Sequence, residues 1–296
     1  QEQADDVEAA LRRTGLEPGL YLVATPIGAA RDITLRALDV LASAEVLVAE
    51  DTRVLRRLME LHGIPRGERA VLSYHDHNGP AQRPRLLGLL AEGRSLAYAS
   101  DAGTPLVADP GFRLAQAAIA AGHAVHAVPG ASSALAALSV AGLPTDRFLF
   151  AGFPPAQGGA RARWLAEILP IPASLVIFES GRRVGALLDA LQAAGEGARA
   201  AALCRELTKR HEEIRRGTVA ELAATAGTAE TRGEMVLVLG PPAARAPAEA
   251  DVAEALEAAL KDRPLKQAAA EVAARLGVRK RDVYQMGLEM RKADGD

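Results

Sequence analysis

The feature that most constrains the fold is an alternation of short apolar runs with helical patterns over residues 20–140. The apolar runs are short, as buried strands are, and lie at 20–24, 46–49, 71–74, 96–99 and 124–128. Between them, apolar residues recur three or four positions apart, as in Leu35, Leu38 and Leu41. Strands that alternate with helices at this spacing predict an α/β domain with a mainly parallel sheet.

Polar residues gather where these predicted strands end. The run at 96–99 breaks into the loop 100–105, which contains an acid, a glycine that permits close backbone approach and a proline that fixes the turn. Small residues at 129–134 follow the apolar run 124–128, and Glu50, Asp51 and Arg53 follow the apolar run 46–49. Ligands of parallel sheets bind at the carboxyl ends of strands, so these segments are candidate binding loops. The alternatives are an ordinary loop capped by Asp101 and a solvated charged face.

The second half of the chain predicts another α/β lobe, followed by helices alone. Its apolar runs lie at 147–155, 174–178, 201–205 and 235–239, and a segment rich in Pro and Ala begins at 240. The predicted organisation is a lead-in at 1–18, an N-terminal lobe at 19–143, a C-terminal lobe at 144–243, and a linker with a helical domain at 244–296.

The C-terminal segment predicts three short helices, at 252–260, 265–276 and 280–290. Residues 261–292 contain nine Lys or Arg and four acidic residues. A basic three-helix unit of this kind is compatible with a helix-turn-helix module that binds nucleic acid. A solvated helical tail that packs on a partner subunit fits the pattern equally well.

Composition excludes several classes of protein. The single cysteine, Cys204, rules out an intrachain disulfide and a multi-cysteine metal site, and we expect a reducing cytoplasm. The formal net charge of -2 means that any surface for a polyanion is a local patch. No signal peptide is expected from the polar, acidic start, and no membrane span from 114–145, where Gly, Pro and Ser interrupt a stretch without charges.

Several common sites are also missing. The chain contains neither the glycine-rich dinucleotide fingerprint after its first strand nor a P-loop, and no G-x-S-x-G context surrounds Ser132. His75 and His77 have no further ligand cluster nearby, so no metal site is predicted.

Taken in order, the motifs resemble one family, the ribosomal RNA small-subunit methyltransferase I family of the tetrapyrrole-methylase superfamily. The motifs that carry this resemblance are Thr25 to Gly28, Asp32 to Leu38, Ala49 to Arg53, Ser73 to Asn78, Ser100 to Pro105, Asp109 to Gly111, Pro129 to Ser132 and Arg205 to Lys209. The tail, at 265–269 and 277–284, resembles the C-terminal helical domain of that family. One departure is that Ala29-Ala30 stands where the family usually has Asn-Leu, so a contact of that Asn would be missing here.

The resemblance implies two α/β lobes with S-adenosylmethionine in the cleft between them, a small C-terminal helical domain, and usually a homodimer. It also implies 2'-O-methylation of a cytidine ribose in the decoding region of 16S ribosomal RNA, with the RNA or the 30S subunit as partner. The expected cofactor-binding residues are Asp101, Gly103, Pro105, Ser132, Ser133, Ala134, Phe178 and Glu234. Candidates for proton handling are Glu50, Asp51, Glu206 and Lys209, and candidates for RNA contact are Arg53, Arg205, Lys280 and Arg281.

Two other functions stay open at this point. A C-methyltransferase for a tetrapyrrole precursor would share the cofactor cleft. A non-enzymatic helix-turn-helix protein could use the first 240 residues as a ligand sensor. The basic tail and the charged motifs after the strands favour RNA.

Overall fold

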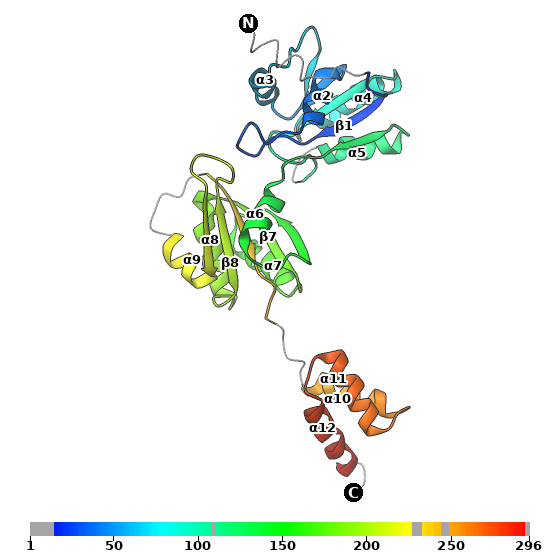
Figure 1. Cartoon of the computed structure of the whole chain (residues 1–296), viewed down its shortest axis with the longest axis vertical. Helices are drawn as coiled ribbons and strands as arrows, with labels where there is room; N and C mark the ends of the chain where they lie inside the picture. The colour runs from blue at the N-terminus through cyan, green and yellow to red at the C-terminus, as the bar shows by residue number, and fades with distance from the viewer. Residues whose placement is uncertain (1–14, 108–110, 227–232, 244–248, 294–296) are drawn as a thin grey trace. The chain divides into compact units, whose positions relative to one another are not determined.

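A computed structural model describes residues 15–107, 111–226, 233–243 and 249–293 (Figure 1). Most of the predicted lead-in, and Asp109 and Pro110 of one motif, lie outside the described residues. The chain divides into two compact units, Gln1–Pro241 and Pro242–Asp296. We describe each unit by itself.

The first sheet of the larger unit is entirely parallel, as the alternating pattern predicts. Its strands are β1 (Gly19–Val23), β2 (Val46–Ala49), β3 (Val71–Ser73), β4 (Ser95–Ala99) and β5 (Val125–Val128). They are ordered β3-β2-β4-β1-β5, and every pair is parallel. All five carboxyl ends therefore meet at one edge, and the loop after the central strand β4 lies between the loops after β1 and β2.

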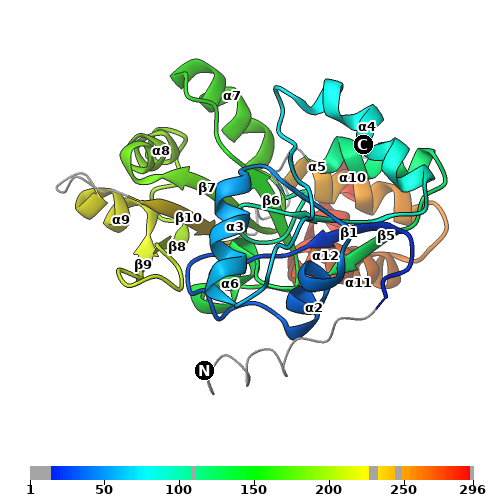
Figure 2. The same ribbon diagram turned by 90° about the horizontal axis from the view of Figure 1, so that it is seen from above.

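Helices cover both faces of this sheet. They are α2 (Leu35–Ser43), α3 (Thr52–Leu61), α4 (Gly79–Ala91) and α5 (Gly111–Ala120). Alternate strand residues divide between two cores, one closed by α2 and α3 and the other by α4 and α5. Side-chain caps fix two helix starts, because Thr34 accepts a hydrogen bond from Ala37 N and Asp51 accepts one from Arg53 N. Figure 2 shows α2 beside β1.

The second sheet of this unit is mixed. Its strands are β6 (Phe148–Gly152), β7 (Ser174–Ser180), β8 (Ala200–Arg205), β9 (Glu213–Thr218) and β10 (Glu234–Leu239), ordered β6-β7-β10-β8-β9. β6 and β7 are parallel, and the remaining pairs are antiparallel. The sequence patterns did not predict β9, because its charged residues suit an edge strand and give no apolar run.

Helices also cover both faces of the second sheet. One face packs on α7 (Gly158–Ile168), α8 (Gly181–Ala193) and α9 (Val219–Ala226). The other face packs on α6 (Ser133–Ala141), where Ala137 and Leu138 contact a core that includes Val236. Thus α6 follows β5 of the first sheet in the chain but packs on the second sheet. The lobe boundary near residue 143 stays a prediction.

The smaller unit consists of three helices in its described part, close to the predicted bounds. They are α10 (Glu249–Leu260), α11 (Leu265–Leu276) and α12 (Lys280–Ala293). They enclose a core of their own, with Leu256, Ala269, Val272 and Val283 at its centre. α11 ends at Gly277, whose φ of 66° is in the left-handed region that glycine favours.

The segment without charges at 114–145 is divided among α5, β5 and α6. Within the described parts of the chain, no helix has the length and apolar character needed to cross a membrane.

Candidate functional site

The loop after β4 is fixed to the loop after β1. Backbone hydrogen bonds of 3.0 Å run in both directions between Thr25 and Gly103, and the Thr25 hydroxyl donates to the Ser100 carbonyl at 2.9 Å. Gly103 has a φ of 80°, which disfavours any residue with a side chain. These contacts give the neighbouring Asp101 a defined place at the edge of the sheet.

The carboxylate of Asp101 connects two strand ends. Its Oδ1 accepts a 2.9 Å hydrogen bond from the backbone N–H of Asp51, the residue that caps α3. The Asp51 carboxylate in turn binds the Arg53 guanidinium, with a shortest distance of 2.6 Å. This side-chain hydrogen bond lowers the pKa of Asp51 to about 2. The pair therefore stays ionised at neutral pH.

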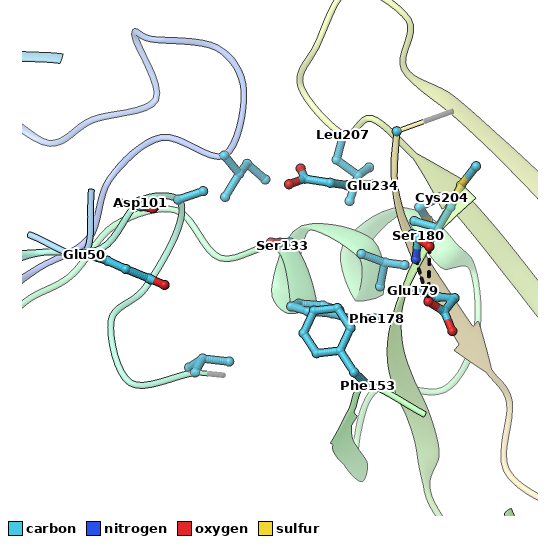
Figure 3. Close-up of a pocket in the computed structure, with 16 residues that line it drawn as sticks. Glu50, Asp101, Ser133, Phe153, Phe178, Glu179, Ser180, Cys204, Leu207 and Glu234 are labelled. Atoms are coloured by element: carbon cyan, nitrogen blue, oxygen red, sulfur yellow. Dashed lines mark hydrogen bonds between the residues drawn. The ribbon is translucent and has the colours of Figure 1, made fainter. Parts of the chain in front are cut away.

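A cavity of about 330 Å³ lies beside Asp101 and takes its walls from both sheets (Figure 3). The second sheet contributes the carboxyl ends of β7 and β8 and the start of β10, which antiparallel pairing brings to one edge. The lining residues are Ile27, Glu50, Asp101, Ala102, Val107, Ser133, Phe153, Phe178, Glu179, Ser180, Cys204, Leu207, Gly233, Glu234, Met235 and Val236. We call this space the donor cavity, because the resemblance predicts that it holds the methyl donor, S-adenosylmethionine.

The donor cavity suits a cation with a flat ring. Among the described residues that line it there are four carboxylates and no Lys or Arg. Phe178 contributes an aromatic surface, and edge-to-face contacts with Phe150 and Phe153, with ring centroids 4.8 and 5.6 Å apart, hold it in place. A sulfonium ion attached to an adenosine fits these properties, because the carboxylates oppose the positive charge and the aromatic surface packs on the base.

Glu179 is a lining residue that sequence reasoning missed. It is 3 % exposed, its Oε1 accepts a hydrogen bond from Ser180 N at 2.8 Å, and its Oε2 lies 3.2 Å from Arg183. The sequence contained a signal for this residue, because Glu179 follows the apolar residues of β7 in the same way as Glu50 follows those of β2.

Cys204 is not suited to nucleophilic chemistry. It is fully buried in the wall of the cavity, and this burial raises its pKa to about 11. The thiol is therefore neutral near pH 7.

Glu206, Lys209 and Glu234 form an ionic network at the rim of the cavity. Lys209 Nζ lies 3.1 Å from Glu206 and 2.8 Å from Glu234, and Glu206 also accepts the backbone N–H of Glu234 at 2.9 Å. This backbone hydrogen bond lowers the pKa of Glu206. Partial burial acts to lower the pKa of Lys209, but its bonds to the two carboxylates raise it by more. Lys209 is therefore a cation near pH 7.

The loop 206–209 contacts the loop after β1 across Gly28. Glu206 and Thr208 have positive φ values of 47° and 64°, which are rare for residues with side chains. The Thr208 hydroxyl accepts a 3.0 Å hydrogen bond from Ala29 N. A Cβ at Gly28 would lie only 2.5 Å from Lys209 Cγ, so glycine is needed for this approach. We call this contact the Gly28 clasp.

Comparisons with known proteins agree with this geometry. The family model of tetrapyrrole (corrin/porphyrin) methylases matches residues 19–223, and that of the RsmI C-terminal HTH domain matches residues 246–291. The Mesorhizobium japonicum protein named ribosomal RNA small subunit methyltransferase I is 46% identical over 282 residues, covering 95% of each chain. The Escherichia coli O157:H7 protein of the same name is 42% identical, and the match covers 91% of this chain and 94% of that protein.

The chain belongs to the ribosomal RNA small subunit methyltransferase I family. The suspected resemblance and the predicted fold class, two α/β lobes with a C-terminal helical region, are confirmed.

Solved structures of other proteins show the same fold. A uroporphyrin-III-C-methyltransferase from Thermus thermophilus aligns with a TM-score of 0.54 at 28% identity, covering 75% of this chain and 94% of that chain. Diphthine synthase aligns with a TM-score of 0.58 at 17% identity, and the alignment covers 75% of this chain and 89% of that chain.

Within this member of the methyltransferase I family, the predicted cofactor residues divide into two groups. Asp101, Ser133, Phe178 and Glu234 line the donor cavity. The others do not line it: Gly103 pairs with Thr25, Pro105 is buried, Ser132 caps α6 and Ala134 packs in the core. Their roles in binding stay predictions.

The predicted RNA-binding residues lie in three places. Arg53 is exposed at the start of α3, and Arg205 ends β8, 4.0 Å from Glu213. Lys280 and Arg281 are exposed at the start of α12, in the smaller unit. The first two belong to the larger unit, with Arg53 shortly after β2 of its first sheet and Arg205 at the end of β8 of its second sheet.

Proposed function

We propose that this protein methylates the ribose 2'-oxygen of a cytidine in the decoding region of 16S ribosomal RNA, with S-adenosylmethionine as methyl donor. The observation that carries this proposal is that relatives named for small-subunit ribosomal RNA match nearly the whole chain. The acidic, aromatic-walled donor cavity supports a sulfonium cofactor.

The residues around the cavity mainly align the reactants and handle a proton. The cofactor supplies an activated methyl group, so transfer to a ribose requires an in-line approach and loss of the hydroxyl proton. Asp101, Glu234 and Phe178 would hold the cofactor on the walls of the donor cavity. The walls of the cavity would also keep bulk water from the reacting groups.

Among the candidates for proton handling, Glu50 has the most suitable position. Asp51 does not line the donor cavity and has a pKa of about 2, and Lys209 is a cation. Glu206 does not line the donor cavity either. The Glu50 side chain extends into the donor cavity in Figure 3. We therefore propose Glu50 as the group that accepts the hydroxyl proton.

The two alternative functions have less support. A tetrapyrrole C-methyltransferase would use the same fold, but the family model that matches residues 246–291 is that of RsmI. A ligand sensor without turnover has less support because the relatives that match nearly the whole chain are named methyltransferases.

The proposal is tested with 30S subunits from cells that lack this activity. Incubation with S-adenosylmethionine labelled on the methyl group should place label on a cytidine ribose, identified after digestion to nucleosides. Glu50→Gln should reduce this labelling about a hundredfold or more, a larger loss than any weakening of cofactor affinity measured by calorimetry. Label on free tetrapyrrole alone, or no turnover of the cofactor, would overturn the proposal.

Two further proposals concern assembly and location. We propose a homodimer, because α5 exposes Phe112 and Ile119, seven residues apart, with 57% and 63% of their surface accessible. We also propose that the protein acts in the cytoplasm, where its ribosomal substrate is found.

A further inference from the structure

A second cavity also borders Asp101 and differs from the donor cavity in its lining residues. It has a volume of about 490 Å³. Its lining residues are Thr25, Pro26, Gly28, Ala30, Asp51, Arg53, Val54, Arg57, Leu58, Leu61 and Asp101. They come from the loop after β1, from α3 with its cap, and from the loop after β4. Asp101 lines both cavities.

The second cavity combines an apolar wall with two guanidinium groups and two carboxylates, and one of these carboxylates, Asp51, binds Nε and Nη2 of Arg53. Val54, Leu58 and Leu61 line it from α3, and Leu61 is 53% exposed although it is a large apolar residue. Arg53 and Arg57, on the same helix, have side chains that are 86% and 70% exposed. The ion pair between Arg57 and Glu60 is long, at 3.5 Å, so the Arg57 guanidinium remains accessible to solvent.

This composition matches one nucleotide of a single RNA strand. Guanidinium groups bind phosphate oxygens, and an apolar surface packs on an unstacked base. The donor cavity, with four carboxylates and no Lys or Arg among its described lining residues, would repel a phosphate, whereas the exposed Arg57 at the second cavity would attract it. Because both cavities meet at Asp101, a ribose placed between them would lie next to the methyl donor.

We propose that this second cavity binds the acceptor nucleotide of the RNA, with its phosphates on Arg53 and Arg57 and its base on Val54, Leu58 and Leu61. The inference rests on the proposed function, which supplies the RNA substrate. It adds the site of the acceptor and assigns Arg57 and the apolar face of α3 to substrate binding.

A third cavity, of about 580 Å³, is a weaker candidate. It shares Ile27 with the donor cavity and is lined by Arg31 and Asp32, whose opposite charges are adjacent in the chain. It is not lined by Asp101 or by the exposed arginines of α3. A nucleotide bound there would therefore not lie next to Asp101.

The test uses α3 itself, because Arg56 offers a matched control. Arg56 is exposed on the same helix but does not line the cavity. Methyl transfer to 30S subunits is measured for wild type, Arg57→Ala and Arg56→Ala over a range of salt concentrations. We expect Arg57→Ala to raise KM for the subunit about tenfold and to lower the slope of log KM against log salt by about 0.7.

A second variant tests the apolar wall. Leu61→Ser should raise KM about fivefold without changing the salt slope, because it removes apolar contact and no charge. The affinity for S-adenosylmethionine, measured by calorimetry, should stay the same in all three variants.

The outcomes separate the two proposals. If wild type fails to label the cytidine ribose, the proposed function is wrong. If wild type labels it and Arg57→Ala behaves like Arg56→Ala, the second cavity does not bind the acceptor. An equal loss of cofactor affinity in Arg57→Ala would also overturn the inference, because the residue would then act on the donor cavity.

Discussion

At the scale of single residues, one carboxylate links most of the site. Asp101 lines two cavities and accepts the backbone N–H of Asp51 through Oδ1. An asparagine in its place can keep that hydrogen bond with its carbonyl oxygen and loses only the charge. The two contributions of Asp101, to the local structure and to the electrostatics of the cavity, can therefore be separated.

We expect Asp101→Asn to weaken S-adenosylmethionine binding by about tenfold to a hundredfold, because a sulfonium in the donor cavity loses a nearby opposite charge. The unfolding temperature should not change. Calorimetry and thermal unfolding measure the two quantities, and Asp76→Asn on an exposed loop provides a control with the same loss of charge. Unchanged cofactor affinity in Asp101→Asn would contradict the prediction.

Sequence patterns identified part of this site. Glu50, Asp101 and Glu234 all flank apolar runs, and the edge of a sheet gathers such positions. Leu58 and Leu61 gave no comparable signal, because leucines at helical spacing are usually core residues. Only the orientation of α3 shows that Leu61 faces a cavity.

At the scale of elements, the Gly28 clasp joins two loops that are 180 residues apart in the chain. The clasp consists of one hydrogen bond, from Ala29 N to Thr208, and a backbone approach that has no room for a methyl group. The loop 206–209 also contributes Leu207 to the donor cavity. The width of that cavity therefore depends on this contact.

Gly28→Ala should move the two loops apart, because the added methyl would lie 2.5 Å from Lys209 Cγ and 2.6 Å from Thr208 Oγ1. We expect a loss of about 1 to 3 kcal/mol in the free energy of unfolding and a weaker affinity for S-adenosylmethionine. Denaturant unfolding and calorimetry measure these changes.

Gly88→Ala is the matched control. Gly88 is exposed inside α4, and a methyl group there meets nothing within 4 Å. This change should stabilise the helix by about 0.5–1 kcal/mol. If both glycine variants behaved alike, the close approach at Gly28 would not matter.

The elements themselves were mostly predictable, and the exceptions have physical causes. Buried strands such as β4 carry apolar residues on both faces, which produces a clear run. The edge strand β9 is charged and has no such signal. The packing of α6 on the second sheet depends on contacts between distant segments, which local patterns do not contain.

At the scale of the whole molecule, the chain combines a unit that holds the cavities with a helical unit that has its own core. Charge is unevenly distributed in the smaller unit. α10 contains four acids and no base, whereas residues 261–292 contain nine Lys or Arg and four acids. Contact with a polyanion is therefore expected from α11 and α12.

Removing residues 242–296 should leave the affinity for S-adenosylmethionine unchanged, because the donor cavity is formed entirely by the larger unit. The KM for 30S subunits should rise, and it should depend less on salt because phosphate contacts are lost. Calorimetry and methyl-transfer assays at several salt concentrations measure both effects. An equal loss of cofactor and RNA binding would instead assign the helices to structural support.

The burial of Cys204 has a practical consequence. The chain contains one cysteine, and it is fully buried with a pKa of about 11. Maleimide dyes react with exposed thiolates, so the natural protein offers them almost no target. A cysteine introduced at the exposed Gln285 of α12 would then take up the dye selectively. The fluorescence of that single dye could report RNA binding by the helical unit without any other change to the chain.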